Sequence, residues 1–229
     1  EAVGRCWLID RYGLLHPGVP DADRLHAFQR RYLRSSSEVP GDGSLLDVVR
    51  AVQPQVLVGV SGQPGLFTAD VVKAMAKGVE RPIILPLSNP TPRAEAIPAD
   101  VVDWTDGRAL IGTGSPFDPV QRGDHVHEIA QVNNVYIFPG VGLGALAVGA
   151  TRITDAMITA ASGAVAELAV GGASDRLLPP VEQSAEAARL VATAVARQAV
   201  ADGVASEGDD LTDAAIDLLI DDHAWHPVY

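Results

Sequence analysis

Short apolar runs alternate with segments of helical periodicity along most of the chain. The runs hold about four to six Val, Ile, Leu and Ala residues and are bounded by Gly, Pro, Asn and Ser. The segments between them carry apolar residues three and four positions apart. This alternation is typical of a parallel sheet covered by helices on both faces. The sequence therefore predicts an α/β fold with flanking helices.

Five of the runs predict strands, and we expect the first three to be buried. The end of the chain has no such run and is helical throughout, so we expect one strand-bearing domain over residues 1–170 and a helical extension packed on it over residues 171–229. The expected strands are Cys6–Ile9, Val56–Gly62, Pro82–Ser88, Ala109–Gly112 and Val135–Phe138.

Capping residues mark where several helices should begin. Ser44 precedes an apolar segment that stops at Pro54, Thr68 precedes one that ends at Gly78, and Thr154 or Asp155 opens a third. The other expected helices are Asp21–Leu33, with Leu25, Phe28 and Tyr32 on one face, Glu182–Asp202, and Leu211–Asp222.

Charge and cysteine content exclude some classes of partner. The formal net charge is −12 and no run of Lys or Arg occurs, so neither nucleic acid nor an anionic membrane surface is an expected partner. No uninterrupted apolar stretch reaches the length of a membrane span. Cys6 is the one cysteine, which rules out an intramolecular disulfide and fits a reducing, cytoplasmic compartment. We expect Cys6 to be a buried structural thiol.

The residues that follow the expected strands are small and polar. Ligands of open parallel sheets bind outside the carboxyl ends of the strands, so these positions are the candidate site. In SNPTP the prolines restrict the backbone around Asn89 and would present its amide rigidly. The candidates are Asp10, Ser61, Gly62, Gly65, Asn89, Thr113, Ser115, Asn133 and Asn134.

Each candidate also has a purely structural interpretation. Asp10 can be a turn or cap residue, or can bind ribose hydroxyls. Gly62 can permit a tight turn or the approach of a cofactor. Asn89 and the Asn133–Asn134 pair are, taken singly, better explained by turns. Such residues recur at several strand ends, and together they favour a functional role more strongly than any one of them does alone.

Two other motifs invite a function. GVGLGA, from Gly140 to Ala145, matches a dinucleotide fingerprint, but a helix follows it and no further strand carries the expected acid. We attribute its small residues to close packing of a helix on the sheet. The HVHE segment, from His125 to Glu128, could bind a metal, but we expect a solvated loop.

Six segments together resemble the C-terminal part of the malic enzymes, in that family's order. They are WLIDRYGLL, LVGVSGQPGLFTADVVKAMA, RPIILPLSNPT, GRALIGTGSPFDPV, QVNNVYIFPGVGLGALA and AWHPVY. The resemblance implies a Rossmann-like NAD(P)-binding domain. It also implies oxidative decarboxylation of malate to pyruvate with NAD or NADP and with Mg or Mn. Family members are usually homo-oligomers.

Site roles follow from the same resemblance, position by position. Asp10 would hold the adenosine ribose, and Ser61 and Gly62 would line the dinucleotide. Asn89 would contact the nicotinamide ribose and the substrate. The malate carboxylate would be bound by Asn134, or by Asn133 and Asn134 together. The two carboxamides at 89 and 134 are therefore expected to converge on one pocket.

The family's catalytic Tyr and Lys, its metal-binding carboxylates and its phosphate-binding glycine loop precede the WLID segment. We therefore expect a fragment, cut just before a strand, that holds no catalytic or metal-binding residue and is inactive without its N-terminal catalytic domain. Three alternatives stay open: a malolactic enzyme, which makes lactate; a non-catalytic nucleotide-binding or assembly module; and NADP as cofactor, with Arg24, Arg30, Arg31 or Arg34 meeting its 2′-phosphate. Surface solvation is the favoured role for most of these arginines.

Overall fold

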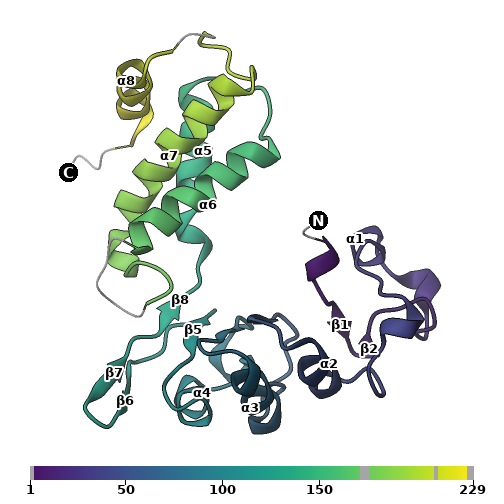
Figure 1. The fold of residues 1–229 in the computed structure, drawn as a ribbon. Coiled ribbons are helices and arrows are strands. Elements are labelled where there is room, and N and C mark those ends of the chain that lie inside the picture. Colours follow the sequence, from purple (N-terminus) through teal and green to yellow (C-terminus); the bar gives the residue numbers. More distant parts are fainter. Residues whose placement is uncertain (1–2, 171–175, 209–210, 226–229) are drawn as a thin grey trace. The chain divides into compact units, whose positions relative to one another are not determined.

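The chain forms two compact units, residues 1–129 and residues 130–229. A computed structural model describes residues 3–170, 176–208 and 211–225 (Figure 1). In the described residues no helix combines the length and the apolar character needed to cross a membrane. The expected boundary at residues 170/171 lies inside the second unit, because the helix on one side of it packs against the helix on the other.

The first unit is built on three parallel strands, in the order β3, β4, β5. Leu57 lies opposite Ile84, and Ile84 lies opposite Ile111, so the apolar residues of neighbouring strands are in register. A helix connects each strand to the next, which confirms the predicted α/β architecture. The strands are β3 (Val56–Gly59), β4 (Ile83–Pro86) and β5 (Leu110–Thr113).

Three helices pack on this sheet, and two of them begin where the sequence predicted. The Ser44 hydroxyl accepts a hydrogen bond from the Asp47 N–H, and the Thr68 hydroxyl accepts one from the Val71 N–H. Val72, Met75 and other buried residues of these helices form the core with the strands. The helices are α2 (Leu45–Val52), α3 (Ala69–Gly78) and α4 (Pro98–Trp104).

Only one face of β3 is covered in the described structure, although we expected the strand to be buried. Leu57 is 8% exposed, whereas Val56, Val58 and Val60 on the opposite face are 47%, 52% and 78% exposed. Alternate residues of a strand point to opposite faces, so the three valines share one solvent-facing surface.

The prediction of a first strand over Cys6–Ile9 in the parallel sheet is wrong, both in the residues of the strand and in the strand it pairs with. The chain forms β1 (Ile9–Asp10), turns at Arg11, and returns antiparallel as β2 (Gly13–Leu14). The strand therefore belongs to a two-residue hairpin outside the parallel sheet. The prediction for Cys6 was also wrong: the thiol is exposed, and Cys6 lies between the short 3-10 helix η1 (Val3–Arg5) and β1 rather than in a strand.

The helix expected over residues 21–33 is two short pieces, η2 (Ala22–Arg24) and α1 (Ala27–Arg30). Leu25 is extended between them, and the His26 N–H donates to the Gln29 side chain, which starts a new turn. Phe28 is consequently 62% exposed rather than buried on a shared face. The following loop contains η3 (Ser36–Glu38).

The HVHE segment is not a loop. Two strands, β6 (Val120–Arg122) and β7 (His125–His127), form an antiparallel hairpin with a turn at Gly123. The rings of His125 and His127 meet edge to face, with centroids 4.5 Å apart.

The second unit opens with β8 (Ala130–Gln131) and is otherwise helical. The fifth expected strand is wrong: its residues form η5 (Asn134–Tyr136) and the start of the first long helix. The Asn133 side chain accepts from the Val135 N–H and so begins this helical turn. The helices are α5 (Phe138–Ala147), α6 (Asp155–Val170), η6 (Val181–Gln183), α7 (Ser184–Ala201) and α8 (Asp213–His223).

The three glycines of GVGLGA lie on α5, and two of them, Gly140 and Gly144, face α7. A Cβ added to Gly140 would lie 2.5 Å from the carbonyl oxygen of Ala188, and one added to Gly144 would lie 3.0 Å from the Cα of Ala192. Helix packing therefore explains these small residues, as predicted, but the partner is another helix rather than the sheet. Thr154 caps α6 by accepting from the Met157 N–H.

Candidate functional site

The loops after β3, β4 and β5 lie together at the carboxyl end of the parallel sheet. The Leu87 N–H donates to the Gly59 carbonyl at 2.8 Å, and the Gly114 N–H donates to the Pro86 carbonyl at 3.4 Å. These bonds continue the parallel pairing into the loops. The prediction that several polar strand ends meet is confirmed for these three, whereas Asp10 follows a strand of the separate β1–β2 hairpin. Asn133 and Asn134 follow β8 (Ala130–Gln131).

A buried carboxylate joins two of the loops. Glu95 is 0% exposed. Its Oε1 accepts from the Ser61 N–H at 2.8 Å, from the Ser61 hydroxyl at 2.8 Å and from the Ser88 hydroxyl at 2.5 Å, and its Oε2 accepts from the Ser88 N–H at 3.3 Å. Gly59 leaves the space that this side chain fills, because a Cβ there would lie 2.6 Å from its carboxyl carbon.

The hydrogen bonds keep Glu95 ionised. Burial by itself raises the pKa of a carboxyl group, because it removes water from the charged form. Bonds donated by Ser88 and Ser61 outweigh burial and hold the pKa of Glu95 below its ordinary value. The loops therefore meet around a fixed negative charge.

Gly62 lies at the surface of this junction. Its N–H donates to the Ser88 hydroxyl at 2.8 Å, and its φ is +67°, a conformation that favours glycine. A Cβ on Gly62 would approach only the Arg93 guanidinium, at 3.8 Å, and one on Gly65 would meet nothing within 4 Å. The turn needs glycine, which bears out the structural interpretation, and the backbone is also unobstructed, so the approach of a cofactor stays a prediction.

Asn89 is held in place by the loop after β5. Its Oδ1 accepts a hydrogen bond from the Ser115 hydroxyl, and the Thr113 hydroxyl donates to the Ser115 carbonyl at 2.8 Å. A Cβ on Gly114 would lie 2.9 Å from the Nδ2 of Asn89, so this glycine admits the amide. No described residue accepts from the Nδ2 group, and the exposed amide can donate to a ligand.

Asp10 is exposed in the β1–β2 hairpin. One carboxylate oxygen accepts from the Arg11 N–H at 2.6 Å and the other from the Gln29 side chain at 3.3 Å. Each carboxylate oxygen can accept more than one bond, so ribose binding stays a prediction.

Asn133 and Asn134 belong to the second unit, and Asn89 belongs to the first. Asn133 starts the η5 turn with its side chain, which fits its structural interpretation, and Asn134 is exposed. Convergence of the two carboxamides at 89 and 134 on one pocket stays a prediction.

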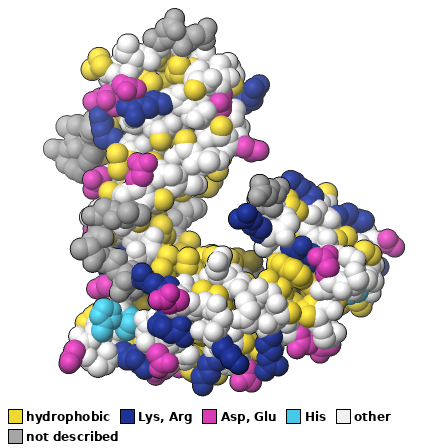
Figure 2. Space-filling view, viewed as in Figure 1, with side chains coloured by type: hydrophobic (Ala, Val, Ile, Leu, Met, Phe, Trp, Pro, Cys, Tyr) yellow, Lys and Arg dark blue, Asp and Glu magenta, His cyan; other side chains and the backbone are white. Residues whose placement is uncertain are grey.

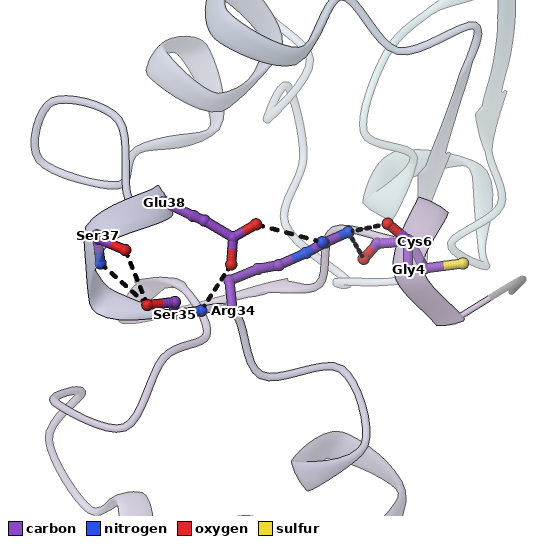
Figure 3. Close-up of polar contacts among 6 residues, drawn as sticks. All are labelled: Gly4, Cys6, Arg34, Ser35, Ser37 and Glu38. Carbon is purple, nitrogen blue, oxygen red and sulfur yellow. Dashed lines mark hydrogen bonds and ion pairs between the residues drawn. The ribbon is translucent and has the colours of Figure 1, made fainter.

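Two of the arginines considered for a 2′-phosphate are occupied by the protein itself, and Figure 3 shows one of them, Arg34. Arg34 donates to the carbonyls of Gly4 and Cys6 at 2.6 and 2.9 Å, lies 3.6 Å from Glu38, and stacks 4.1 Å above the Trp7 ring. Its side chain is only 13% exposed, so Arg34 is not among the arginines that surface solvation explains. Arg30 donates to the carbonyls of Asp23 and Leu25.

The charged surface and the candidate metal ligands add little to the site. On the face in Figure 2, the described Lys and Arg side chains are interspersed with Asp and Glu and form no extended basic patch. The described residues also contain no cluster of three or more His, Cys, Asp and Glu side chains that could hold a metal ion.

Sequence reasoning missed Glu95 and the contact between the Ser115 hydroxyl and Asn89. Glu95 sits in the apolar segment AEAI, and an acid between two alanines in such a segment was the available signal for a buried carboxylate. No local pattern indicated that Ser115 would reach Asn89.

Comparison with known proteins adds a family to this geometry. Residues 1–200 match the family described as the malic enzyme NAD binding domain. The NAD-dependent malic enzyme 1 of Vibrio vulnificus (strain YJ016) is 47% identical over 238 residues, and the NAD-dependent malic enzyme of Aliivibrio fischeri (strain ATCC 700601 / ES114) is 46% identical over 239 residues. Each comparison covers 100% of this chain but 41% of the relative.

Two solved structures share the fold. The malic enzyme of Entamoeba histolytica superposes with a TM-score of 0.71 at 32% identity, over 93% of this chain and 40% of the other. The malic enzyme from Pyrococcus horikoshii superposes with a TM-score of 0.65 at 23% identity, over 92% and 43%, and supports the fold alone. This chain spans about two-fifths of its relatives' length, and it belongs to the malic enzyme NAD-binding domain family.

Proposed function

We propose that this chain is the NAD-binding part of a malic enzyme, a longer polypeptide that oxidatively decarboxylates malate to pyruvate. The observation that carries the proposal is the junction of three loops at the carboxyl end of the parallel sheet. There the open backbone at Gly62 and the fixed amide of Asn89 lie where dinucleotides bind in such folds. The family match over residues 1–200 and the relatives named NAD-dependent malic enzymes support it.

Each candidate residue has a proposed role. Ser61 and Gly62 line the dinucleotide, and Asp10 accepts hydrogen bonds from the adenosine ribose. Asn89 donates to the nicotinamide ribose and to the substrate. Asn134, with Asn133, binds the malate carboxylate. A neutral amide orients a carboxylate without adding a charge that would retain the product.

When bound, NAD accepts the hydride that leaves C2 of malate. The residues of this chain bind and orient the two reactants, and proton transfer belongs to residues outside it. Mg or Mn is expected from the family, but the described residues provide no cluster that fits a metal ion, so we assign it no step in this chain.

NAD is the proposed cofactor rather than NADP. Arg30 and Arg34 are committed to backbone carbonyls and to Glu38, so neither is available to a 2′-phosphate without losing those bonds. Comparing kcat/KM for the two cofactors in the full-length enzyme tests this. A preference for NADP would contradict it.

The central test is a spectrophotometric assay of malate-dependent NADH formation. The full-length enzyme should form NADH and pyruvate, whereas the 229-residue chain alone should form none and bind NAD weakly. NADH formation by the chain alone would refute its inactivity. Lactate as the product of the full-length enzyme would refute oxidative decarboxylation. Light scattering would test the proposed homo-oligomer.

A further inference from the structure

We propose that Glu95 is a positioning residue, which locks the loop after β3 to the loop after β4 and so fixes the dinucleotide site. The inference rests on the proposed function, since the site it positions is the NAD site. Glu95 itself has no exposed surface through which to contact a ligand. It acts through two serines. Ser61 directly precedes Gly62, and Ser88 accepts a hydrogen bond from the Gly62 N–H and directly precedes Asn89.

The hydrogen-bond pattern requires a carboxylate. All four groups that Glu95 binds are donors directed at it, three at Oε1 and one at Oε2. An ionised carboxylate only accepts, and its two oxygens have enough lone pairs for all four bonds. A glutamine of the same shape would place an NH2 group opposite the Ser88 N–H, where two donors repel each other.

The backbone beside Glu95 holds the same loop at its far end. The Phe67 N–H donates to the Glu95 carbonyl at 3.0 Å, and the Gly65 N–H donates to the Ala94 carbonyl at 3.3 Å. The side chain of Glu95 binds the start of the loop at Ser61. The loop from Ser61 to Phe67 is therefore fixed at both ends by one short segment.

A purely structural role is the competing explanation. Burying a charge is costly, and well-packed apolar groups often stabilise a protein as well as a buried ionic network does. Glu95 lies at the carboxyl ends of the strands, where both loops carry candidate NAD contacts. A structural role predicts a loss of stability alone, whereas a positioning role predicts a loss of NAD affinity in protein that remains folded.

The test uses the full-length enzyme and its Glu95→Gln variant. NAD dissociation constants from calorimetry, steady-state KM values and thermal unfolding without NAD are measured together. Glu95→Gln should weaken NAD binding about tenfold or more, the factor expected when a buried donor loses its acceptor. The KM for malate at saturating NAD should change much less.

Thr105→Val is the matched control. Thr105 is also fully buried, and its hydroxyl donates to the Val101 carbonyl and accepts from the Ala109 N–H, but it precedes β5 and so lies at the opposite end of the sheet. This variant should lose thermal stability while its NAD affinity stays within about twofold of the parent.

Ser88→Ala provides a second test that does not depend on the folding of Glu95→Gln. It removes the hydroxyl that links Glu95 to the Gly62 N–H, but leaves the carboxylate bound to Ser61. NAD binding should weaken, and in the double variant the two losses should be less than additive.

The outcomes separate the two proposals. If the parent enzyme binds no NAD, the proposed function fails. If the parent binds NAD and folded Ser88→Ala or Glu95→Gln binds it equally well, the positioning role is overturned. Full additivity of the two substitutions would also overturn it.

Discussion

Gly144 on α5 offers a sharp test of how the second unit packs, because Gly142 on the same helix provides the control. A Cβ on Gly144 would lie 3.0 Å from both the carbonyl carbon and the Cα of Ala192, and closer still to its carbonyl oxygen. These are backbone atoms of α7 and cannot rotate away. A Cβ on Gly142 would meet nothing within 4 Å.

The magnitude follows from these contacts. For Gly144→Ala, α5 and α7 must separate by about 0.5–1 Å, which forfeits about a quarter to a half of the dispersion energy of the contacts that open. Overpacking of this kind costs about 1–3 kcal/mol. Both Ala variants gain helix propensity of about 0.8–1 kcal/mol, which cancels in the comparison. Gly144→Ala should therefore be about 1–3 kcal/mol less stable than Gly142→Ala.

Urea unfolding followed by circular dichroism measures this difference. The interface concerned contains Val191, Ala192 and Val195 of α7, all 0% exposed, so its loosening should lower the unfolding midpoint. Gly142→Ala should match or exceed the parent in stability. Equal stability of the two variants would refute the close approach of α5 to α7.

Three further predictions concern the first unit. The pKa of Glu95 in the folded protein is lowered from 4.5, so its carboxylate contributes stability that is complete above pH 4.5 and is lost as the pH falls through the folded pKa. The difference in stability between the parent and Glu95→Gln should therefore shrink on acidification. Urea titrations in which this difference widens at falling pH would contradict the prediction. Arg34→Ala should cost about 1–3 kcal/mol in urea unfolding through its lost carbonyl and Trp7 contacts, whereas Arg31→Ala, at an exposed position, should stay within about 0.5 kcal/mol of the parent. Thr105→Val should cost about 1–3 kcal/mol, because it leaves the Ala109 N–H without its acceptor, and calorimetric unfolding checks this.

The elements fixed by local chemistry could be predicted from the sequence. Ser44 and Thr68 cap α2 and α3 because the groups they bind lie three residues further along the chain. The β3–β5 strands were also predictable, since each is a short apolar run between turn residues. Their polar ends could be expected to meet because parallel strands share one carboxyl edge.

The sequence-based predictions fail where contacts between residues far apart in the sequence determine the structure. VYIF is apolar enough for a strand or a helix, and the helical unit settles the choice: Tyr136 is 2% exposed and its hydroxyl donates to the Pro179 carbonyl, 43 residues away in sequence. Glu95 takes its role from Ser61, 34 residues earlier. The local sequence pattern indicates neither the contact of Tyr136 with Pro179 nor that of Glu95 with Ser61.

The valines on the outer face of β3 have a consequence for handling the protein. Val56 and Val58 of β3, with Val60 just beyond its end, form an apolar strip, and β3 lies at one end of its sheet. Such strips promote adhesion between copies, whereas a net charge of −12 keeps copies apart. Added salt weakens the repulsion and leaves the strip unchanged. The purified chain should therefore stay monodisperse when it is dilute and in low-salt buffer. It should self-associate when it is concentrated and in high-salt buffer.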